Sequence, residues 1–292
     1  MKVDGRQFRT VWLEDDQVTM IDQRLLPHSF EVIHLPTVAD TAHAIFDMAI
    51  RGAGAIGATG AYGMAQAAIQ APADVEGFEQ AMAQAAATLG GTRPTAQNLF
   101  YGINAVIQAA QAEAPDVEKA RQAAVAAAHA VADDDSDKCR RIGEHGAELI
   151  GDRWGISTHC NAGWLAFVDW GSALSPIYAA HRQGKRPLVY VDETRPRCQG
   201  ARLTCWELAG EGVDHALVVD GAVGHYMQWD KVQMVIVGSD RIAYNGDVAN
   251  KIGTFASACM AHQAGVPFYV AAPTTTIDPN CPAGREIPIE ER

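Results

Sequence analysis

The chain has 292 residues, of which 48% are hydrophobic and 20% are charged, as is typical of a globular protein with a sizeable core. Its formal net charge of -12 argues against nucleic acid or an anionic membrane as a partner, because both repel an acidic surface. No apolar run reaches the length of a transmembrane helix, and the first residues lack the apolar core of a signal peptide, so we expect a cytoplasmic protein.

The first half of the chain predicts a β-hairpin followed by helices. Two apolar runs flank a polar turn and indicate a hairpin over residues 8–21. Apolar residues at helical spacing then predict helices over residues 41–50, 60–70, 75–89, 99–114 and 117–132. We expect the Asp-rich run at 133–137 to cap or link helices. The predicted organisation is a hairpin plus helical domain over 1–132 and a connecting helix over 133–150.

The second half alternates short apolar runs with helix-like stretches. The runs cover residues 156–160, 187–192, 216–220, 234–240 and 267–272, and helices are predicted over 173–183, 200–209 and 248–265. This alternation predicts an α/β domain over 151–292, with a Rossmann-like parallel sheet, right-handed crossovers and helices on both faces. Four of the strands end in Cys160, Asp192, Asp220 and Asp240. We expect these side chains along one edge of the sheet, where ligands bind.

A Gly-rich segment at residues 52–57 matches the pattern G-x-G-x-x-G. The pattern signals a dinucleotide site only when it follows a strand, and residues 41–50 are predicted to be helical. We therefore expect no nicotinamide or flavin cofactor. Arg51 and the amides that follow it can instead form an anion cradle that leads into a helix at Gly60. The alternative is a helix–helix turn that needs small residues.

A second polar loop covers residues 91–98. Thr95 is predicted to cap a helix that begins near Ala96. Arg93 precedes a proline, which favours an extended backbone, and a single loop arginine is most simply solvated. Together with Arg51, however, it favours recognition of a phosphate.

Two strand ends carry candidate acid–base groups. Cys160 can act as nucleophile or base if the amides after it lower its pKa, and the alternative is a buried, inert thiol. His159 alternates with Cys160, so it should face the other side of the strand and form no Cys–His dyad with it. Asp240 ends a buried strand, where desolvation is expected to raise its pKa and suit it to acid–base work. None of the six cysteines forms a Cys-x-x-Cys pair, so we expect free thiols and no metal site.

The segments after the strands carry candidate binding groups. Gln199 lies just before a predicted helix, where it can contact an anion or a sugar or simply cap the helix. Asp220 can likewise cap the next helix rather than contact a ligand. Asn250 and Lys251 are predicted inside the helix over 248–265, folded back towards Asp240 by a turn at 245–247. Lys251 can bind phosphate or be an exposed surface lysine.

Seven motifs in one order resemble the methylthioribose-1-phosphate isomerase family. They lie at residues 22–27, 51–57, 91–95, 158–163, 192–196, 199–204 and 238–253. The resemblance runs from near residue 10 to the end of the chain, and its family also includes ribose-1,5-bisphosphate isomerases and regulatory subunits of translation initiation factor 2B. It implies an N-terminal helical domain and a C-terminal Rossmann-like domain, usually in a homodimer.

The resemblance also implies an activity and its residues. The expected reaction is the aldose–ketose isomerisation of 5-methylthioribose 1-phosphate to 5-methylthioribulose 1-phosphate in methionine salvage, with a phosphorylated pentose as substrate and with neither metal nor cofactor. Cys160 and Asp240 match the catalytic pair. The positions that match substrate-binding residues are Arg51, Gly52, Ala53, Arg93, Gln199, Asn250 and Lys251.

Two alternatives to this activity stay open. A sister isomerase would act on 5-deoxyribose 1-phosphate or ribose 1,5-bisphosphate, and Gly54, Ser239, Trp164 and Cys198 depart from the residues expected at their positions. A regulatory protein on the same scaffold would be free to lose the catalytic pair, which is present here. Family members usually continue beyond residue 292, so either the C-terminus of this protein is shortened or the C-terminal domain over 151–292 is incomplete.

Overall fold

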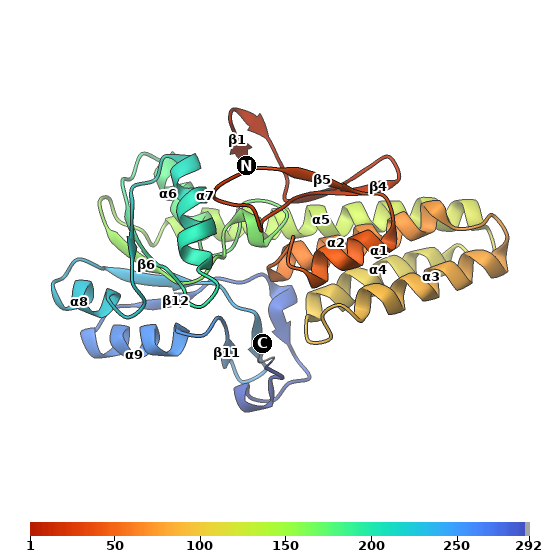
Figure 1. Cartoon of the computed structure of the whole chain (residues 1–292). Coiled ribbons are helices and arrows are strands. Elements are labelled where there is room, and N and C mark those ends of the chain that lie inside the picture. The colour runs from red at the N-terminus through yellow and green to blue at the C-terminus, as the bar shows by residue number, and fades with distance from the viewer. Residues whose placement is uncertain (290–292) are drawn as a thin grey trace. The chain divides into compact units, whose positions relative to one another are not determined.

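The computed structural model describes residues 1–289 of the chain. It contains two compact units, named here the helical unit and the sheet unit (Figure 1). The helical unit consists mainly of Arg9–Ser136 and Ala166–Val168. The sheet unit consists of Met1–Phe8, Asp137–Leu165 and Asp169–Ile287.

The helical unit begins with a three-stranded antiparallel sheet. β3 (Val11–Glu14) and β4 (Gln17–Ile21) form the predicted hairpin. β5 (Val32–Leu35), which was not predicted, pairs with the other edge of β4. Because β4 is the central strand and its apolar side chains are buried, it joins the sheet to the core of the unit.

Helices form the rest of the unit and pack around α2. They are α1 (Val38–Phe46), α2 (Ala53–Gln70), α3 (Val75–Gly90), α4 (Gln97–Ala112) and the first part of α5 (Val117–Ala147). α2 is buried from Gly54 to Ala68 and contacts α1, α3 and α4. A side chain at Gly102 of α4 would lie 2.1 Å from the carbonyl oxygen of Gly57 in α2. The two backbones therefore touch, and the crossing requires glycine.

The Gly-rich segment belongs to α2 and is not a loop. The helix begins at Ala53, with Gly52 as its N-cap, so the prediction of a helix entered at Gly60 is wrong. The alternative of a helix–helix turn fits only residue 52, because the small residues from Gly54 onward lie inside α2, where Gly54 and Gly57 are in close contact with α5 and α4. Only Gly52, at φ +96°, keeps the positive backbone angle that glycine adopts without strain.

Two further helix boundaries differ from prediction. α5 continues through the Asp-rich run, because Asp135 is buried there and accepts a hydrogen bond from the Val168 N–H at 2.8 Å. Thr95 does not cap α4, whose N-cap is Ala96 without a capping side chain. Polar composition alone did not reveal that the Asp135 carboxylate is buried. It also did not reveal that α4 begins without a capping side chain.

A five-stranded parallel sheet forms the centre of the sheet unit. In spatial order its strands are β12 (Phe268–Val270), β9 (Met234–Val237), β6 (Gly155–Thr158), β7 (Leu188–Asp192) and β8 (His215–Val218). Every neighbouring pair is parallel, which confirms the predicted Rossmann-like sheet. Helices α6 (Ser175–Arg182) and α7 (Cys205–Glu211) cover one face, and α8 (Val223–Gln228) and α9 (Thr254–Ala264) cover the other (Figure 1).

The order of the strands reverses between β6 and β9. The chain steps outward from β6 to β7 and β8, and then returns to place β9 and β12 on the opposite side of β6. In open parallel sheets, ligands bind outside the carboxyl ends of the strands at such a reversal. The residues that follow β6 and β9 therefore occupy the position where a site is expected in this unit.

Small strands complete the sheet unit. A mixed sheet contains β10 (Arg241–Ala243), β11 (Val248–Ala249) and β13 (Ile277–Asp278), and β1 (Lys2–Val3) pairs with β2 (Arg6–Gln7). The helix predicted from residue 248 begins only at Thr254, because residues 248 and 249 pair with β10 instead. Asn250 and Lys251 consequently lie in the turn before α9, and the prediction that they lie within the helix is wrong.

Candidate active site

Cys160 follows β6 and is held in an unusual backbone conformation. Its φ is +67°, a value that residues other than glycine seldom adopt. Its N–H donates to Thr194 Oγ1 at 2.8 Å, and its carbonyl oxygen accepts from Thr204 Oγ1 at 2.7 Å. Two buried hydroxyl groups from other elements thus fix both peptide groups of a buried thiol. Strained residues held in this way are concentrated at functional sites.

A buried carboxylate fixes the turn that follows Cys160. Oε1 of Glu207 in α7 accepts from Asn161 Nδ2 at 2.8 Å and from the Leu165 N–H at 3.2 Å. Oε2 accepts from the Trp164 N–H at 2.8 Å and from the Tyr178 hydroxyl at 2.7 Å. Burial raises the pKa of Glu207 from 4.5 to about 6, although its four hydrogen bonds act in the opposite direction. Glu207 was not predicted as a site residue.

The loop after β7 is attached to the end of β8. Thr194, also at positive φ (+65°), and Arg195 donate their N–H groups to the Asp220 carboxylate, each at 2.7 Å. Asp220 therefore does not cap α8, whose N-cap is Ala222. Thr194 was missed as a site residue, although it lies in one of the quoted motifs and a hydroxyl after a buried strand end was available as a signal.

His159 is engaged away from Cys160. Its Nδ1 lies 2.8 Å from Asp192 Oδ2, and its Nε2 lies 2.7 Å from the carbonyl oxygen of Ile252. Both ring nitrogens thus have partners other than the thiol, which confirms that these neighbours form no Cys–His dyad. His159 and Asp192 are 2% and 1% exposed, so the pair is shielded from solvent.

The ligand-type atoms of His159, Asp192 and Asp220 lie within 4.8 Å of one another. Both nitrogens of His159 and both oxygens of Asp220 already have protein partners. A metal ion would have to displace these hydrogen bonds, so the arrangement is that of a hydrogen-bonded cluster. It serves to connect the ends of β6, β7 and β8.

Asp240 is exposed. The prediction that it is buried at the end of a strand is therefore wrong. β9 ends at Val237, and the chain leaves the sheet before Asp240. The Asp240 N–H donates to the carbonyl oxygen of Ala249 at 2.9 Å, which places Asp240 at the base of the β10–β11 hairpin. Its backbone is thus fixed next to the turn that carries the candidate binding residues.

Gln199 is buried directly before η2 (Gly200–Thr204), a π-helical turn that leads into α7. Such turns occur frequently at functional sites. The capping alternative is wrong, because the Gln199 side chain makes no capping hydrogen bond. Its Oε1 is buried without a hydrogen-bond partner, so it can accept one from a ligand.

Asn250 and Lys251 lie half-buried in the turn between β11 and α9. Asn250 Nδ2 donates to Thr254 Oγ1 at 3.0 Å, and that hydroxyl donates to the carbonyl oxygen of Lys251 at 2.7 Å. The turn is therefore ordered by its own polar groups. Lys251 is not the fully exposed surface lysine that the alternative reading supposed.

In the helical unit, Arg51, Gly52 and Ala53 form the N-terminal end of α2. No side chain caps this 18-residue helix, and its first turn contains no acidic residue. Uncapped N–H groups beside an arginine are the arrangement that binds phosphate at helix N-termini. A side chain at Gly52 would lie 2.4 Å from Cα and O of Ala166, so the entry to α2 depends on glycine here.

The structure thus places the predicted residues in two sets, one in each unit. Cys160, Gln199, Asp240, Asn250 and Lys251 lie in the sheet unit, after its strands or before its helices. The other set is in the helical unit and consists of Arg51, Gly52, Ala53 and Arg93, which is half-buried in the loop between α3 and α4.

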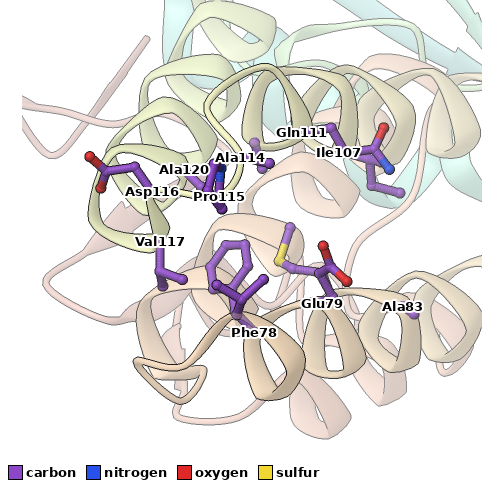
Figure 2. A pocket seen from close by; sticks show the side chains of 13 residues that line it. Phe78, Glu79, Ala83, Ile107, Gln111, Ala114, Pro115, Asp116, Val117 and Ala120 are labelled. Carbon is purple, nitrogen blue, oxygen red and sulfur yellow. The ribbon is translucent and has the colours of Figure 1, made fainter.

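A cavity of about 400 Å³ within the helical unit belongs to neither set. It lies between α3, α4 and the start of α5, with Phe78 and Val117 at its apolar wall and Glu79 and Asp116 also lining it (Figure 2). None of the predicted site residues lines it.

Over residues 1–289, no helix combines the length and the apolar character that crossing a membrane requires.

A Rossmann-like sheet with a constrained cysteine at its strand reversal, and with a lysine in the turn between β11 and α9, is the arrangement of an enzyme or receptor for a small polar ligand. The model of the initiation factor 2 subunit family matches residues 49–292. Methylthioribose-1-phosphate isomerase of Roseiflexus sp. (strain RS-1) is 48% identical over 98% of this chain and 82% of its own length. The namesake enzyme of Chloroflexus aurantiacus is 49% identical over 98% and 83%.

Solved structures agree with these relatives. The crystal structure of 5-methylthioribose 1-phosphate isomerase from Pyrococcus horikoshii OT3 has a TM-score of 0.91 and 40% identity, over 98% of this chain and 81% of its own. A structure named translation initiation factor eIF-2B subunit delta, from A. fulgidus, has a TM-score of 0.88 and 44% identity, over 98% and 83%. The chain belongs to the initiation factor 2 subunit family and, within it, to the methylthioribose-1-phosphate isomerases.

Proposed function

We infer that the protein is an aldose–ketose isomerase that converts 5-methylthioribose 1-phosphate to 5-methylthioribulose 1-phosphate, a step of methionine salvage. The observation that carries this inference is the identity of 48% and 49% to isomerases of that name over nearly the whole chain. The position of Cys160 and Asp240 after the two strands that flank the reversal agrees with it.

The reaction poses a particular chemical difficulty. Phosphate on the anomeric oxygen prevents the sugar from opening spontaneously to a free aldehyde, so the enzyme must drive the ring open. The C1–ring oxygen bond breaks, the ring oxygen gains a proton, one hydrogen leaves C2 and one arrives at C1. The hydroxyl group on C2 loses its proton and becomes the ketone. Proton donors and acceptors are therefore needed at two places on the sugar.

We assign these two tasks to Asp240 and Cys160. Asp240 donates the proton to the ring oxygen. Because its side chain is exposed, the bound sugar itself must shield it from water. Cys160 acts at C1 and C2, either by abstracting a proton or by stabilising the hydrogen that is transferred. Positioned groups of this kind contribute about 10²- to 10⁴-fold each to rate.

The remaining residues are proposed to bind the substrate. In the helical unit, the open N-terminus of α2, with Arg51, Gly52 and Ala53, is suited to phosphate, and Arg93 supplies further positive charge. In the sheet unit, Lys251 is suited to phosphate by its own charge. The buried Oε1 of Gln199 and the amide of Asn250 are suited to sugar hydroxyl groups. Each of these roles is a proposal that single substitutions can test.

The deciding experiment compares purified protein on three substrates. Turnover of 5-methylthioribose 1-phosphate should exceed that of 5-deoxyribose 1-phosphate and ribose 1,5-bisphosphate. Cys160→Ser and Asp240→Asn should each reduce kcat by at least about 10²-fold. Cys259→Ser and Asp230→Asn, at exposed positions of the same unit, are matched controls that should keep normal turnover. Near-normal turnover of either active-site variant would refute its assigned role.

Isotope exchange separates the two chemical routes at C1 and C2. If a base removes the C2 proton, the reaction in deuterated water should place deuterium at C1 of the ketose. If hydrogen moves directly as hydride, the product should carry none. Retention of the substrate hydrogen in every turnover would count against an enediolate that exchanges with solvent.

A regulatory role is the second candidate, because a relative at 44% identity carries the name of a translation initiation factor subunit. That role does not need the Cys160–Asp240 pair, whereas an isomerase does. Absence of turnover on all three sugar phosphates would favour it. Preference for ribose 1,5-bisphosphate would instead indicate the sister isomerase, whose second phosphate needs another basic cluster.

A homodimeric state is also proposed, from the family resemblance, and the cytoplasmic location expected from the sequence stays a proposal. A sedimentation-equilibrium mass of twice the 31.2 kDa chain would support the dimer, and a single-chain mass would refute it.

A further inference from the structure

His159 connects two parts of the candidate site although it contacts neither of the proposed catalytic groups through its ring nitrogens. Its Nε2 lies 2.7 Å from the Ile252 carbonyl oxygen, and Nδ1 lies 2.8 Å from Asp192 Oδ2. A carbonyl oxygen only accepts hydrogen bonds, so Nε2 must carry a proton. The ring therefore donates to the backbone of the segment that follows Lys251.

The backbone of that segment is shaped around the ring. Gly253 adopts φ +105°, and a side chain there would lie 2.6 Å from Cε1 and 2.7 Å from Nε2 of His159. Gly253 is also the N-cap of α9, and its carbonyl oxygen accepts the Ser257 N–H at 3.1 Å. The imidazole thus holds the start of α9 and the turn before it by contact as well as by hydrogen bonding.

The same network reaches Cys160. Asp192 holds His159 through its carboxylate, and its carbonyl oxygen accepts from Thr194 Oγ1 at 3.0 Å. Thr194 Oγ1 in turn accepts the Cys160 N–H at 2.8 Å. A continuous chain of buried contacts therefore joins Cys160 to the turn that carries Asn250 and Lys251.

We propose that His159, anchored by Asp192, is a positioning residue that holds Asn250 and Lys251 in their substrate-binding place through the Ile252 carbonyl group. This inference rests on the proposed function, in which Lys251 binds the phosphate of the sugar. His159 itself touches no substrate. It restricts the turn before α9 to one conformation, so that binding does not have to supply the ordering free energy.

Protonation of His159 strengthens the anchor. Burial lowers its pKa, but the hydrogen bond to Asp192 and the charges of Asp192 and Asp220 outweigh this effect and raise it. These two carboxylates, at the ends of β7 and β8, are the charged groups that face the ring, and Lys251 lies on the held segment itself. Burial also raises the pKa of Asp192, against the effect of His159, so the pair retains a proton between them. The Nδ1 contact is complete below the raised pKa of His159 and is lost as pH rises through it.

Steady-state kinetics on 5-methylthioribose 1-phosphate test the proposal. His159→Phe keeps a ring but has no donor, so KM should rise about 10-fold or more, the effect of one lost hydrogen bond to a buried group, with a smaller change in kcat. His159→Gln keeps an N–H donor and should restore most of the affinity. His215→Phe is the matched control, because His215 also bonds a backbone carbonyl, that of Val213, and should leave KM within about twofold.

A double substitution separates this proposal from the function on which it rests. Lys251→Ala alone should raise KM if Lys251 binds the phosphate. Adding His159→Phe should then raise KM by a smaller factor than it does in the wild type, because the part of its effect that acts through Lys251 is already lost. If Lys251→Ala raises KM and His159→Phe does not, the positioning role is refuted while the binding role stands. If Lys251→Ala itself has no effect, the proposed binding role fails first.

The pH dependence of KM gives a second, independent reading. In the wild type, KM should rise on the alkaline side as the Nδ1 contact is lost, and this rise should be absent from His159→Gln. Equal pH profiles for the two proteins would overturn the proposal. Because the glutamine variant keeps side-chain volume and a donor, this comparison decides the question even if the phenylalanine variant fails to fold.

Discussion

Replacing Glu207 by Gln should change how stability depends on pH. Glu207 is 1% exposed, and its carboxylate accepts four hydrogen bonds, from two backbone N–H groups and from Asn161 and Tyr178. Burial opposes the charge and the four donors favour it. The pKa is raised from 4.5 to about 6, so burial outweighs the donors.

The magnitude follows from this rise in pKa. A rise from 4.5 to about 6 corresponds to about 2 kcal/mol, at about 1.36 kcal/mol for each unit of pKa. The folded state favours the protonated acid, so Glu207 contributes stability that is fully present below pH 4.5 and is lost as pH rises through about 6. Glutamine does not titrate. The free energy of unfolding of the wild type should therefore fall by about 2 kcal/mol relative to Glu207→Gln between pH 4.5 and pH 7.

Urea unfolding of both proteins across this pH range measures the difference in their free energies of unfolding. The other titrating groups are common to both proteins, so their contributions cancel in this difference. Tyr178→Phe provides a further comparison. It removes a donor that lowers the pKa, so the loss of stability should move to higher pH. A difference that does not vary with pH, or a wild type that gains stability as pH rises through 6, would show that the four donors outweigh burial and would refute the reasoning.

Two glycines provide further tests, each with a matched control. Gly52→Ala should cost more than about 2 kcal/mol, because the new Cβ meets Ala166 at 2.4 Å in addition to the strain of positive φ, and should raise KM if the entry to α2 binds phosphate. Gly184→Ala has similar φ (+88°) and open space, so only the strain of about 1–2 kcal/mol should appear in urea unfolding. Gly102→Ala should destabilise by about 1–3 kcal/mol through its contact with α2, whereas Gly210→Ala, in α7 with nothing within 4 Å, should stabilise by up to about 1 kcal/mol. Equal effects within either pair would contradict the packing argument.

The parts of the fold that were predicted correctly depend on local patterns. Short apolar runs separated by helix-length stretches indicated the parallel sheet, because the burial of such a sheet is visible in neighbouring residues. The absence of a His159–Cys160 dyad was also predicted, but both residues follow the end of β6 at Thr158, so its cause is the partners of the His159 ring and not strand alternation. The order of the strands, and hence the reversal between β6 and β9, was not visible in this way.

The segment from residue 238 to 253 was misread because its structure depends on distant pairing. Ile252 and Phe255 have helical spacing, yet their side chains are exposed, and residues 248 and 249 pair with β10. Asp240 followed an apolar run and was therefore expected to be buried, although β9 ends at Val237. Periodicity identified the presence of a strand and a helix here but not where each ends.

Glu207 and Thr204 were missed as site residues for a different reason. An acid among the apolar residues of a short helix is compatible with an exposed face, and only the fold places it against residues 161–165. Thr204 lies in a quoted motif, but its bond to the Cys160 carbonyl oxygen spans 44 residues of sequence. Partners that are distant in the chain leave no periodic pattern, so such contacts emerge only from the structure.

The adjacent residues 159 and 160 show how one strand end can serve two requirements. Thr194 and Thr204 hold the strained peptide groups of Cys160, and Asp192 holds the ring of His159. The two arrangements meet at Asp192, whose carbonyl oxygen accepts from the Thr194 hydroxyl group. A change that moves Asp192 should therefore disturb the thiol and the turn before α9 together, whereas Thr194→Val should disturb the thiol alone. The proposed acid–base group and the proposed substrate-binding turn are in this sense not independent, because the Asp192 carboxylate holds His159 while the Asp192 carbonyl oxygen holds Thr194.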